Sequence, residues 1–289
     1  MRYYVVDVFA EQKYQGNPLA VFLPDQECSK IEMQQIAREI NYSETTFIMS
    51  GKKQDGGYDV RIFTPDREVP FAGHPTLGTA FIINQLLEQS QCDQVILNLG
   101  VGQIPVNITE EELSMEQKGP DFRTVIEQPE VMAEILQINV EDINCNYPIQ
   151  VVSTGLPSII VPLHTLDAVK RCSIHHEKFQ AFIDHTVKAG VLVFAPESEK
   201  EENDLRVRVF MDDTGFLEDP ATGSANGNLA GYLLEHNFYN TPKINLRVEQ
   251  GYEMGRPSLI KVEAEKVGRQ FRINIGGKVF LVAKGEWMN

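Results

Sequence analysis

Residues 71–78 read FAGHPTLG, and they mark the point where a strand-like segment runs into a helix. A glycine at such a junction permits a tight turn and lets another molecule approach the backbone closely. Pro75 suits the first position of that helix, and Ala80 and Phe81 continue an apolar pattern at helical spacing. A helix that is apolar on most of its sides is buried. We therefore expect the helix after Gly73 to lie inside a domain.

A second copy of this junction occurs later in the chain. Residues 221–225 read ATGSA and open another apolar helix, and Gly223 follows Gly73 by 150 positions (223 − 73). Three further pairs of segments match in the same order: 16–18 with 155–157, 61–63 with 208–210, and 95–103 with 244–251. Self-similarity at a fixed offset indicates a duplicated architecture. The chain is therefore predicted to contain two related halves.

The composition excludes several classes of partner. The 289 residues carry 26 Lys and Arg against 41 Asp and Glu, a net charge of −15. Nucleic acid and anionic membranes require basic surface, so neither is expected as a partner. No apolar run reaches the ~18 residues of a membrane-spanning helix. The four scattered cysteines have no metal-ligand spacing and are typical of reduced thiols in the cytoplasm. The acid-rich stretch 197–204 is expected to be a solvated loop without a functional role.

The two glycine junctions share a chemical property. The first turn of a helix has backbone N–H groups without internal partners, and the helix dipole adds partial positive charge there. Two such helix starts could hold one small carboxylate without any Lys or Arg. His74 and Ser224 are polar residues at the same offset from the two glycines. This match favours a binding role over a merely tight turn.

Two carboxylates are candidates for acid–base chemistry. Glu44 stands at the entry to an apolar strand, and alternation places it on one face with Thr46. A carboxylate on an otherwise buried face should have a raised pKa, as a general acid–base near neutral pH requires. Asp219 precedes Pro220, which favours extended backbone, and lies four residues before Gly223. From the residues alone, an exposed strand-end glutamate and a turn or capping aspartate remain open alternatives.

Three strings resemble the signatures of the phenazine-biosynthesis PhzF-like family: NYSET at 41–45, GHPT at 73–76 and EDPATGSA at 218–225. Residues 7–9, 16–18 and 61–65 fit the family as well. The resemblance implies a diaminopimelate-epimerase-like α+β fold with two pseudo-symmetric domains, each a curled, mostly antiparallel sheet around a central helix. We place the domains at 1–118 and 119–289, the first also able to take up the C-terminal strand. The active-site cleft is expected between them.

The same resemblance assigns roles to individual residues. Glu44 matches the family's catalytic acid–base, and Asp219 and His74 match the assisting catalytic residues. Asn17 would line the pocket, and the substrate carboxylate would be held by the backbone amides of Gly73, His74, Gly223 and Ser224. The family's characterised reaction isomerises a dihydro-hydroxyanthranilate by moving a proton between ring carbons. The resemblance thus implies a homodimeric, cofactor-independent and metal-independent isomerase of a small carboxylate substrate.

Two other functions stay open at this point. Epimerases and racemases on this fold use two facing cysteines, but the matching positions here hold Ala72 and Thr222. Neither side chain ionises usefully, so a two-thiol mechanism is excluded. A one-base amino-acid racemase through Glu44 is not excluded. A non-catalytic ligand-binding protein on the same scaffold is the third possibility, although the polar motif residues of an active enzyme are all present.

Overall fold

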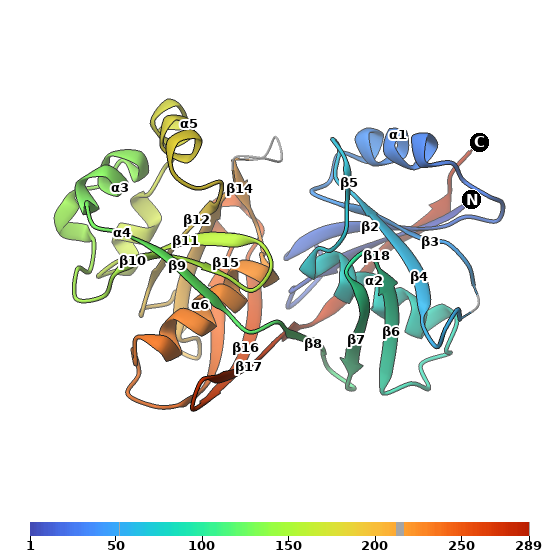
Figure 1. Cartoon of the computed structure of the whole chain (residues 1–289). Helices are drawn as coiled ribbons and strands as arrows, with labels where there is room; N and C mark the ends of the chain where they lie inside the picture. Colours follow the sequence, from blue (N-terminus) through green and yellow to red (C-terminus); the bar gives the residue numbers. More distant parts are fainter. Residues whose placement is uncertain (52, 212–216, 289) are drawn as a thin grey trace. The chain divides into compact units, whose positions relative to one another are not determined.

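The computed structural model describes residues 1–51, 53–211 and 217–288. The chain divides into two compact units: unit 1 is Met1–Glu116 with Gly276–Asn289, and unit 2 is Gln117–Ile275. Each unit is a mixed, mostly antiparallel sheet that curls around one central helix (Figure 1). The predicted α+β class with a curled sheet is confirmed. The C-terminal strand belongs to unit 1.

Unit 1 has its strands in the order β18, β1, β2, β3, β4, β6, β7, β8, with the short β5 paired to β4. The pairs β2–β3 and β4–β6 are parallel and the other pairs are antiparallel. Helix α2 (Gly73–Leu86) is central, and α1 (Lys30–Ile40) connects β2 to β3. The strands are β1 (Arg2–Val8), β2 (Asn17–Leu23), β3 (Thr45–Ile48), β4 (Tyr58–Phe63), β5 (Glu68–Val69), β6 (Gln94–Leu99), β7 (Gly102–Ile108), β8 (Leu113–Gln117) and β18 (Val279–Glu286).

Unit 2 repeats this topology with the order β9, β10, β11, β12, β13, β15, β16, and β14 pairs with β13. As in unit 1, the third and fifth pairs in this order, β11–β12 and β13–β15, are the parallel ones. The strands are β9 (Asp121–Ile126), β10 (Ile149–Ser153), β11 (Pro157–Pro162), β12 (Gly190–Ala195), β13 (Leu205–Phe210), β14 (Glu218–Asp219), β15 (Lys243–Gln250), β16 (Ser258–Val267) and β17 (Gln270–Gly277). The helices are α3 (Pro129–Leu136), α4 (Leu166–Arg171), α5 (His176–His185) and the central α6 (Gly223–Glu235).

Local signals explain where the helices begin and end. The Ser29 hydroxyl accepts a hydrogen bond from the Glu32 amide at 3.2 Å, and α1 ends at Asn41 in the left-handed conformation. Helix α2 begins at Gly73, so Pro75 is its third residue and not its first, as the sequence had suggested. A proline is equally tolerated there, because the first-turn N–H groups have no internal partner.

A glycine in each central helix allows close packing against a neighbouring strand residue. A Cβ added to Gly78 of α2 would lie 2.6 Å from Leu19 of β2, and one added to Gly227 of α6 would collide with Gln117. Most residues of both helices are buried, as their apolar sequences predicted. The helix starts are therefore held at fixed depth in each unit. No helix in the described part of the chain is long and apolar enough to cross a membrane.

Candidate active site

In unit 1, the carboxylate of Glu44 lies beside the start of α2. Glu44 immediately precedes β3, in which Thr46 is fully buried and hydrogen-bonded to Thr79 of α2 at 2.8 Å. Strand alternation turns Glu44 toward the same helix. Its Oε2 is 3.6 Å from Nε2 of His74, and the two side chains are 17% and 5% exposed. Glu44 is thus mostly buried, which removes the alternative of an exposed strand-end glutamate.

The imidazole beside Glu44 is neutral. Burial lowers the pKa of His74 to about 3, although a hydrogen bond between its ring and the backbone of Pro18 acts in the opposite direction. Proline has no N–H, so the ring donates to the Pro18 carbonyl. Nε2 has no hydrogen-bond partner among the described residues. It therefore carries the lone pair, and this lone pair faces the Glu44 carboxyl group.

The other predicted residues of unit 1 surround this pair. Gly73 is the first residue of α2, and its N-cap, Ala72, has no side-chain group that could cap the helix. The amides of Gly73 and His74 are therefore not capped by that residue. Asn17 is fully buried at the start of β2 and directly precedes Pro18, the hydrogen-bond acceptor of His74. Unit 1 thus brings together Glu44, His74, Gly73 and Asn17.

In unit 2, Asp219 lies in β14 and is coupled to the start of α6. The hydroxyl of Thr222 donates to Oδ2 of Asp219 at 2.5 Å and accepts from Nε2 of Gln250 at 3.0 Å. Thr222 is the N-cap of α6, yet it makes no capping hydrogen bond. A threonine at this position normally caps the helix. Here its hydroxyl is held elsewhere, so the amides of Gly223 and Ser224 are not capped by it.

Gln250 is a site residue that the sequence did not reveal. It is fully buried at the end of β15, and its Nε2 also donates to the carbonyl of Asp219 at 2.7 Å. Its Oε1 accepts from the amide of Thr222 at 3.1 Å and from the side chain of Asn226 at 3.0 Å. One amide side chain therefore fixes the turn that carries Asp219. In the sequence, the only indication of Gln250 was its position in the repeated segment 244–251.

A second buried network, also missed, supports the first turn of α6. Gln117 donates to the carbonyl of Gly223 at 3.1 Å and accepts from the hydroxyl of Thr154 at 2.9 Å. The amide of Thr154 donates to Asn228 of α6 at 2.6 Å. These residues lie far apart in the chain, so no local pattern indicates their contact. Together they hold the helix start in one orientation.

Unit 1 holds a carboxyl group beside a neutral imidazole, and the helix start of each unit has amides that its N-cap side chain leaves uncapped. Among residues 1–51, 53–211 and 217–288, no cluster of three or more His, Cys, Asp and Glu side chains could hold a metal ion. The four cysteines are free thiols and lie outside the helix starts.

Comparison with known proteins places these motifs in a family. The family model described as phenazine biosynthesis-like protein, PhzC-PhzF, matches residues 6–285. The chain belongs to this family. An uncharacterized isomerase of Clostridium acetobutylicum is 34% identical to it over 98% of this chain and 96% of the relative. The trans-2,3-dihydro-3-hydroxyanthranilate isomerase of Pseudomonas aeruginosa is 33% identical over 98% of both chains.

Solved structures agree with this PhzF-family assignment. A Bacillus anthracis phenazine biosynthesis protein of the PhzF family has a TM-score of 0.90 at 26% identity, covering 100% of this chain and 99% of the other. A probable proline racemase from Agrobacterium radiobacter K84 has a TM-score of 0.62 at 11% identity, covering 99% of this chain and 92% of the other, and shares the fold alone. The predictions of this family, its fold class and an isomerase are confirmed.

Proposed function

We propose that this PhzF-family protein is a cofactor-independent isomerase that moves a proton between two carbons of a small carboxylate substrate, with Glu44 as the acid–base residue. The observation that carries the proposal is the position of Glu44, 3.6 Å from the neutral His74 at the start of α2. The name of the Pseudomonas aeruginosa relative supports trans-2,3-dihydro-3-hydroxyanthranilate, or a close analogue, as the substrate.

Glu44 takes the proton from one substrate carbon and returns it to another, so the enzyme ends unchanged. While the proton resides on Glu44, the new carboxylic O–H can donate to the lone pair on Nε2 of His74. An imidazolium at this position would instead hold Glu44 in its ionised form. Because the pKa of His74 is about 3, the ring stays neutral at physiological pH and does not oppose protonation of Glu44. Acid–base catalysis of this kind contributes ~10²–10⁴-fold in rate.

The helix starts supply the binding of negative charge. Neither α2 nor α6 has an acidic residue in its first turn, and His74 of α2 is neutral, so the amides and the helix dipole dominate there. In our proposal, the amides of Gly73, His74, Gly223 and Ser224 bind the substrate carboxylate. Asp219 and Asn17 contact its other polar groups. That both units serve a single substrate stays a prediction, as do the homodimer and the cytoplasmic location.

The decisive experiment follows carbon-bound hydrogen in D₂O. Wild-type protein should convert trans-2,3-dihydro-3-hydroxyanthranilate and incorporate deuterium from solvent into the product, measured by NMR. Glu44→Gln should still bind the substrate, in calorimetric titration, yet neither convert it nor exchange its hydrogen. Glu39→Gln, an exposed glutamate of α1, makes the same chemical change away from the site and should behave as wild type.

Retained exchange in Glu44→Gln contradicts the role of Glu44. Binding without conversion by the wild type, across a panel of cyclic and dienyl carboxylates, supports a ligand-binding protein instead. Inversion of an amino acid's α-carbon by the wild type, lost in Glu44→Gln, supports the one-base racemase. The three functions therefore give three different outcomes: an isomerised product, binding without conversion, or an inverted amino acid.

A further inference from the structure

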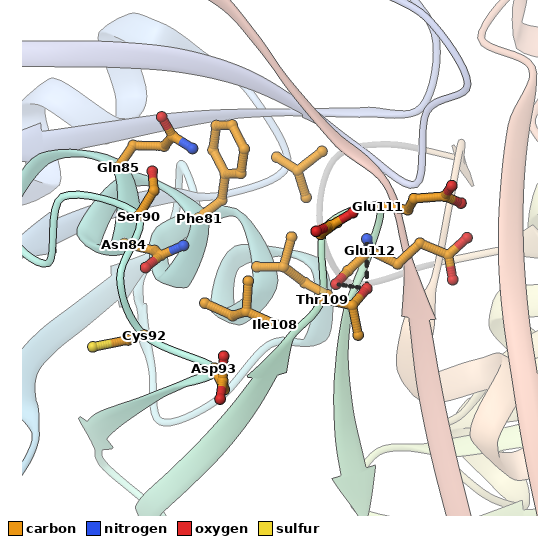
Figure 2. Close-up of a pocket in the computed structure, with 13 residues that line it drawn as sticks. Phe81, Asn84, Gln85, Ser90, Cys92, Asp93, Ile108, Thr109, Glu111 and Glu112 are labelled. Carbon is orange, nitrogen blue, oxygen red and sulfur yellow. Dashed lines mark hydrogen bonds between the residues drawn. The ribbon is translucent and has the colours of Figure 1, made fainter.

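A cavity of about 660 Å³ opens in unit 1 near the end of α2, and neither Glu44 nor His74 lines it. Its size falls within the ~300–1,000 Å³ of ordinary small-molecule sites. Apolar side chains of Phe81, Ile108, Leu113 and Val279 form part of its wall. Figure 2 shows Phe81 and Ile108 in the middle of this wall, between polar groups on either side. The cavity could thus cover the apolar body of a ligand.

The charged part of the wall is entirely acidic. Asp93, Glu110, Glu111 and Glu112 line the cavity, and no Lys, Arg or His among the described residues does so. Within the described parts of the chain, Asp93, Glu110 and Glu111 take part in no ion pair. The last turn of α2 has no basic residue, so the negative end of the helix dipole is also uncompensated there. The cavity therefore favours a cation.

An independent observation points to a hydrogen-bond donor as the ligand. Asn84 of α2 lines the cavity, is 7% exposed, and has a buried Oδ1 with no hydrogen-bond partner in the described ranges. A buried amide oxygen without a partner is costly. In Figure 2 the amide of Asn84 lies at one end of the site and the carboxylates of Glu111 and Glu112 at the other. The wall thus presents acceptors on both sides of an apolar surface.

We propose that this cavity binds a small organic ammonium ion. Its N–H groups would bond to the carboxylates and to Asn84, and its apolar part would pack on Phe81 and Ile108. A metal ion is the less suitable cation, because the described residues contain no cluster of three or more ligands that could hold one. The ligand class is separate from the carboxylate substrate proposed above, and the inference does not depend on the isomerase reaction.

The test is a calorimetric titration of the whole chain with two probes of similar shape and opposite charge. Phenethylammonium should bind with a Kd of about 1 mM or lower, while 3-phenylpropionate should not bind at this site. The double variant Glu110→Gln/Glu111→Gln should weaken phenethylammonium binding about threefold to tenfold, since two exposed charges are lost. Asn84→Leu should weaken it as well, with circular dichroism confirming the native fold.

The matched control is Glu27→Gln/Glu39→Gln, which removes two exposed charges of unit 1 that do not line the cavity. Equal weakening in this control would show non-specific attraction to an acidic protein and overturn the proposal. Equal binding of 3-phenylpropionate, no binding of phenethylammonium at about 10 mM, or its displacement by Mg²⁺ at about 1 mM would overturn it too.

Discussion

The two units hold equivalent turns with different chemistry. In unit 1, strand pairing sets Asp59 opposite Asn98, and Asn98 donates to Oδ1 of Asp59 at 2.7 Å and to the carbonyl of Gln54 at 2.8 Å. In unit 2, the same pair of positions holds Arg206 and Glu249. These two are 1% and 0% exposed and form an ion pair at 3.2 Å. One unit uses a half-exposed polar contact, and the other a buried pair of charges.

In unit 2, the buried carboxylate holds its turn by accepting several hydrogen bonds. Glu249 accepts hydrogen bonds from the backbone amides of Glu199 and Lys200 at 2.7 and 3.0 Å, and from Asn203 at 2.7 Å. The acid-rich stretch 197–204 exposes its glutamates, as the sequence indicated, but its backbone is fastened to the core. The duplicated topology thus preserves where a turn is held and not which groups hold it.

The two helix starts differ in a comparable way. In unit 1, a neutral histidine faces the carboxyl group of Glu44. In unit 2, the carboxylate of Asp219 already accepts from Thr222, which Gln250 holds in place. In our proposal, proton transfer falls to unit 1 and positioning to unit 2. The following changes test this division, beginning with the largest expected effect.

Neutralising each carboxylate should affect catalysis unequally. Glu44→Gln should lower kcat by ~10²–10⁴-fold, because it removes the proton acceptor. Asp219→Asn should lower kcat/KM by only ~10–100-fold, the value of one charged hydrogen bond. Steady-state kinetics on the same substrate measures both. Equal losses would show that the two units share the proton transfer.

The two turn-holding contacts should differ in their value for stability. Glu249→Gln leaves Arg206 buried without its full partner and should lower the free energy of unfolding by about 3–5 kcal/mol. Asn98→Ala in unit 1 should cost about 1–2 kcal/mol, the range for lost hydrogen bonds. Urea unfolding followed by circular dichroism compares them. A larger loss for Asn98→Ala would reverse the comparison.

The neutral imidazole makes unit 1 sensitive to acid. The pKa of His74 is lowered from 6.5 to about 3, so below about pH 6.5 the unfolded chain takes up a proton that the folded chain refuses. Stability is therefore complete above this range and is lost as the pH falls. Between about pH 7.5 and about pH 5 the loss from this residue should be about 2 kcal/mol. His74→Asn should lack that part of the pH dependence, and an unchanged slope in urea titrations would argue against a neutral His74.

If Gln250 is removed, the Thr222 oxygen should compete with the substrate carboxylate for the first-turn amides of α6. In Gln250→Met the Thr222 oxygen no longer accepts from Gln250 and can cap α6 while its hydroxyl still donates to Asp219, so KM should rise about threefold to tenfold, the value of an N-cap. The double variant Gln250→Met/Thr222→Ala should recover a nearly normal KM, because unit 1 already has alanine at the equivalent position, Ala72. A KM that stays high in the double variant would show that Gln250 acts only on the fold.

Local patterns predicted the elements well. The Ser29–Glu32 pair, the glycine junctions and the alternation around Glu44 each depend on residues close in the chain, and the structure has Ser29 as an N-cap, both helix starts at glycine and Glu44 beside α2. The sequence pattern predicts a helix around 176–188 and a strand from Leu19 to Leu23, whereas the helix ends at His185 and the strand begins at Asn17. Such end positions depend on tertiary contacts as much as on propensity.

Long-range contacts were beyond prediction. The neutrality of His74 follows from its burial and from Pro18, 56 positions earlier (74 − 18). Gln250 of β15 accepts a hydrogen bond from the amide of Thr222, 28 positions earlier. Glu249 accepts one from the amide of Glu199, 50 positions earlier. His74 lies in the first turn of α2, and Glu249 and Gln250 are neighbours at the end of β15, and none of these positions indicates in the sequence which distant group it contacts. Only the packed structure shows these contacts.

Because strand β18 belongs to unit 1, the two units can complete their folding at different stages of synthesis. It pairs with β1, and the backbone of Trp287 exchanges hydrogen bonds with Met1 at 2.9 and 2.8 Å. Unit 2 is continuous in the chain, whereas unit 1 waits for a strand that the ribosome makes after all of unit 2. We therefore expect nascent chains stalled before Val279 to contain a protease-resistant unit 2 and a protease-sensitive unit 1. The half that is translated first would be the half that matures last, with the edge of β1 exposed to chaperones in the meantime.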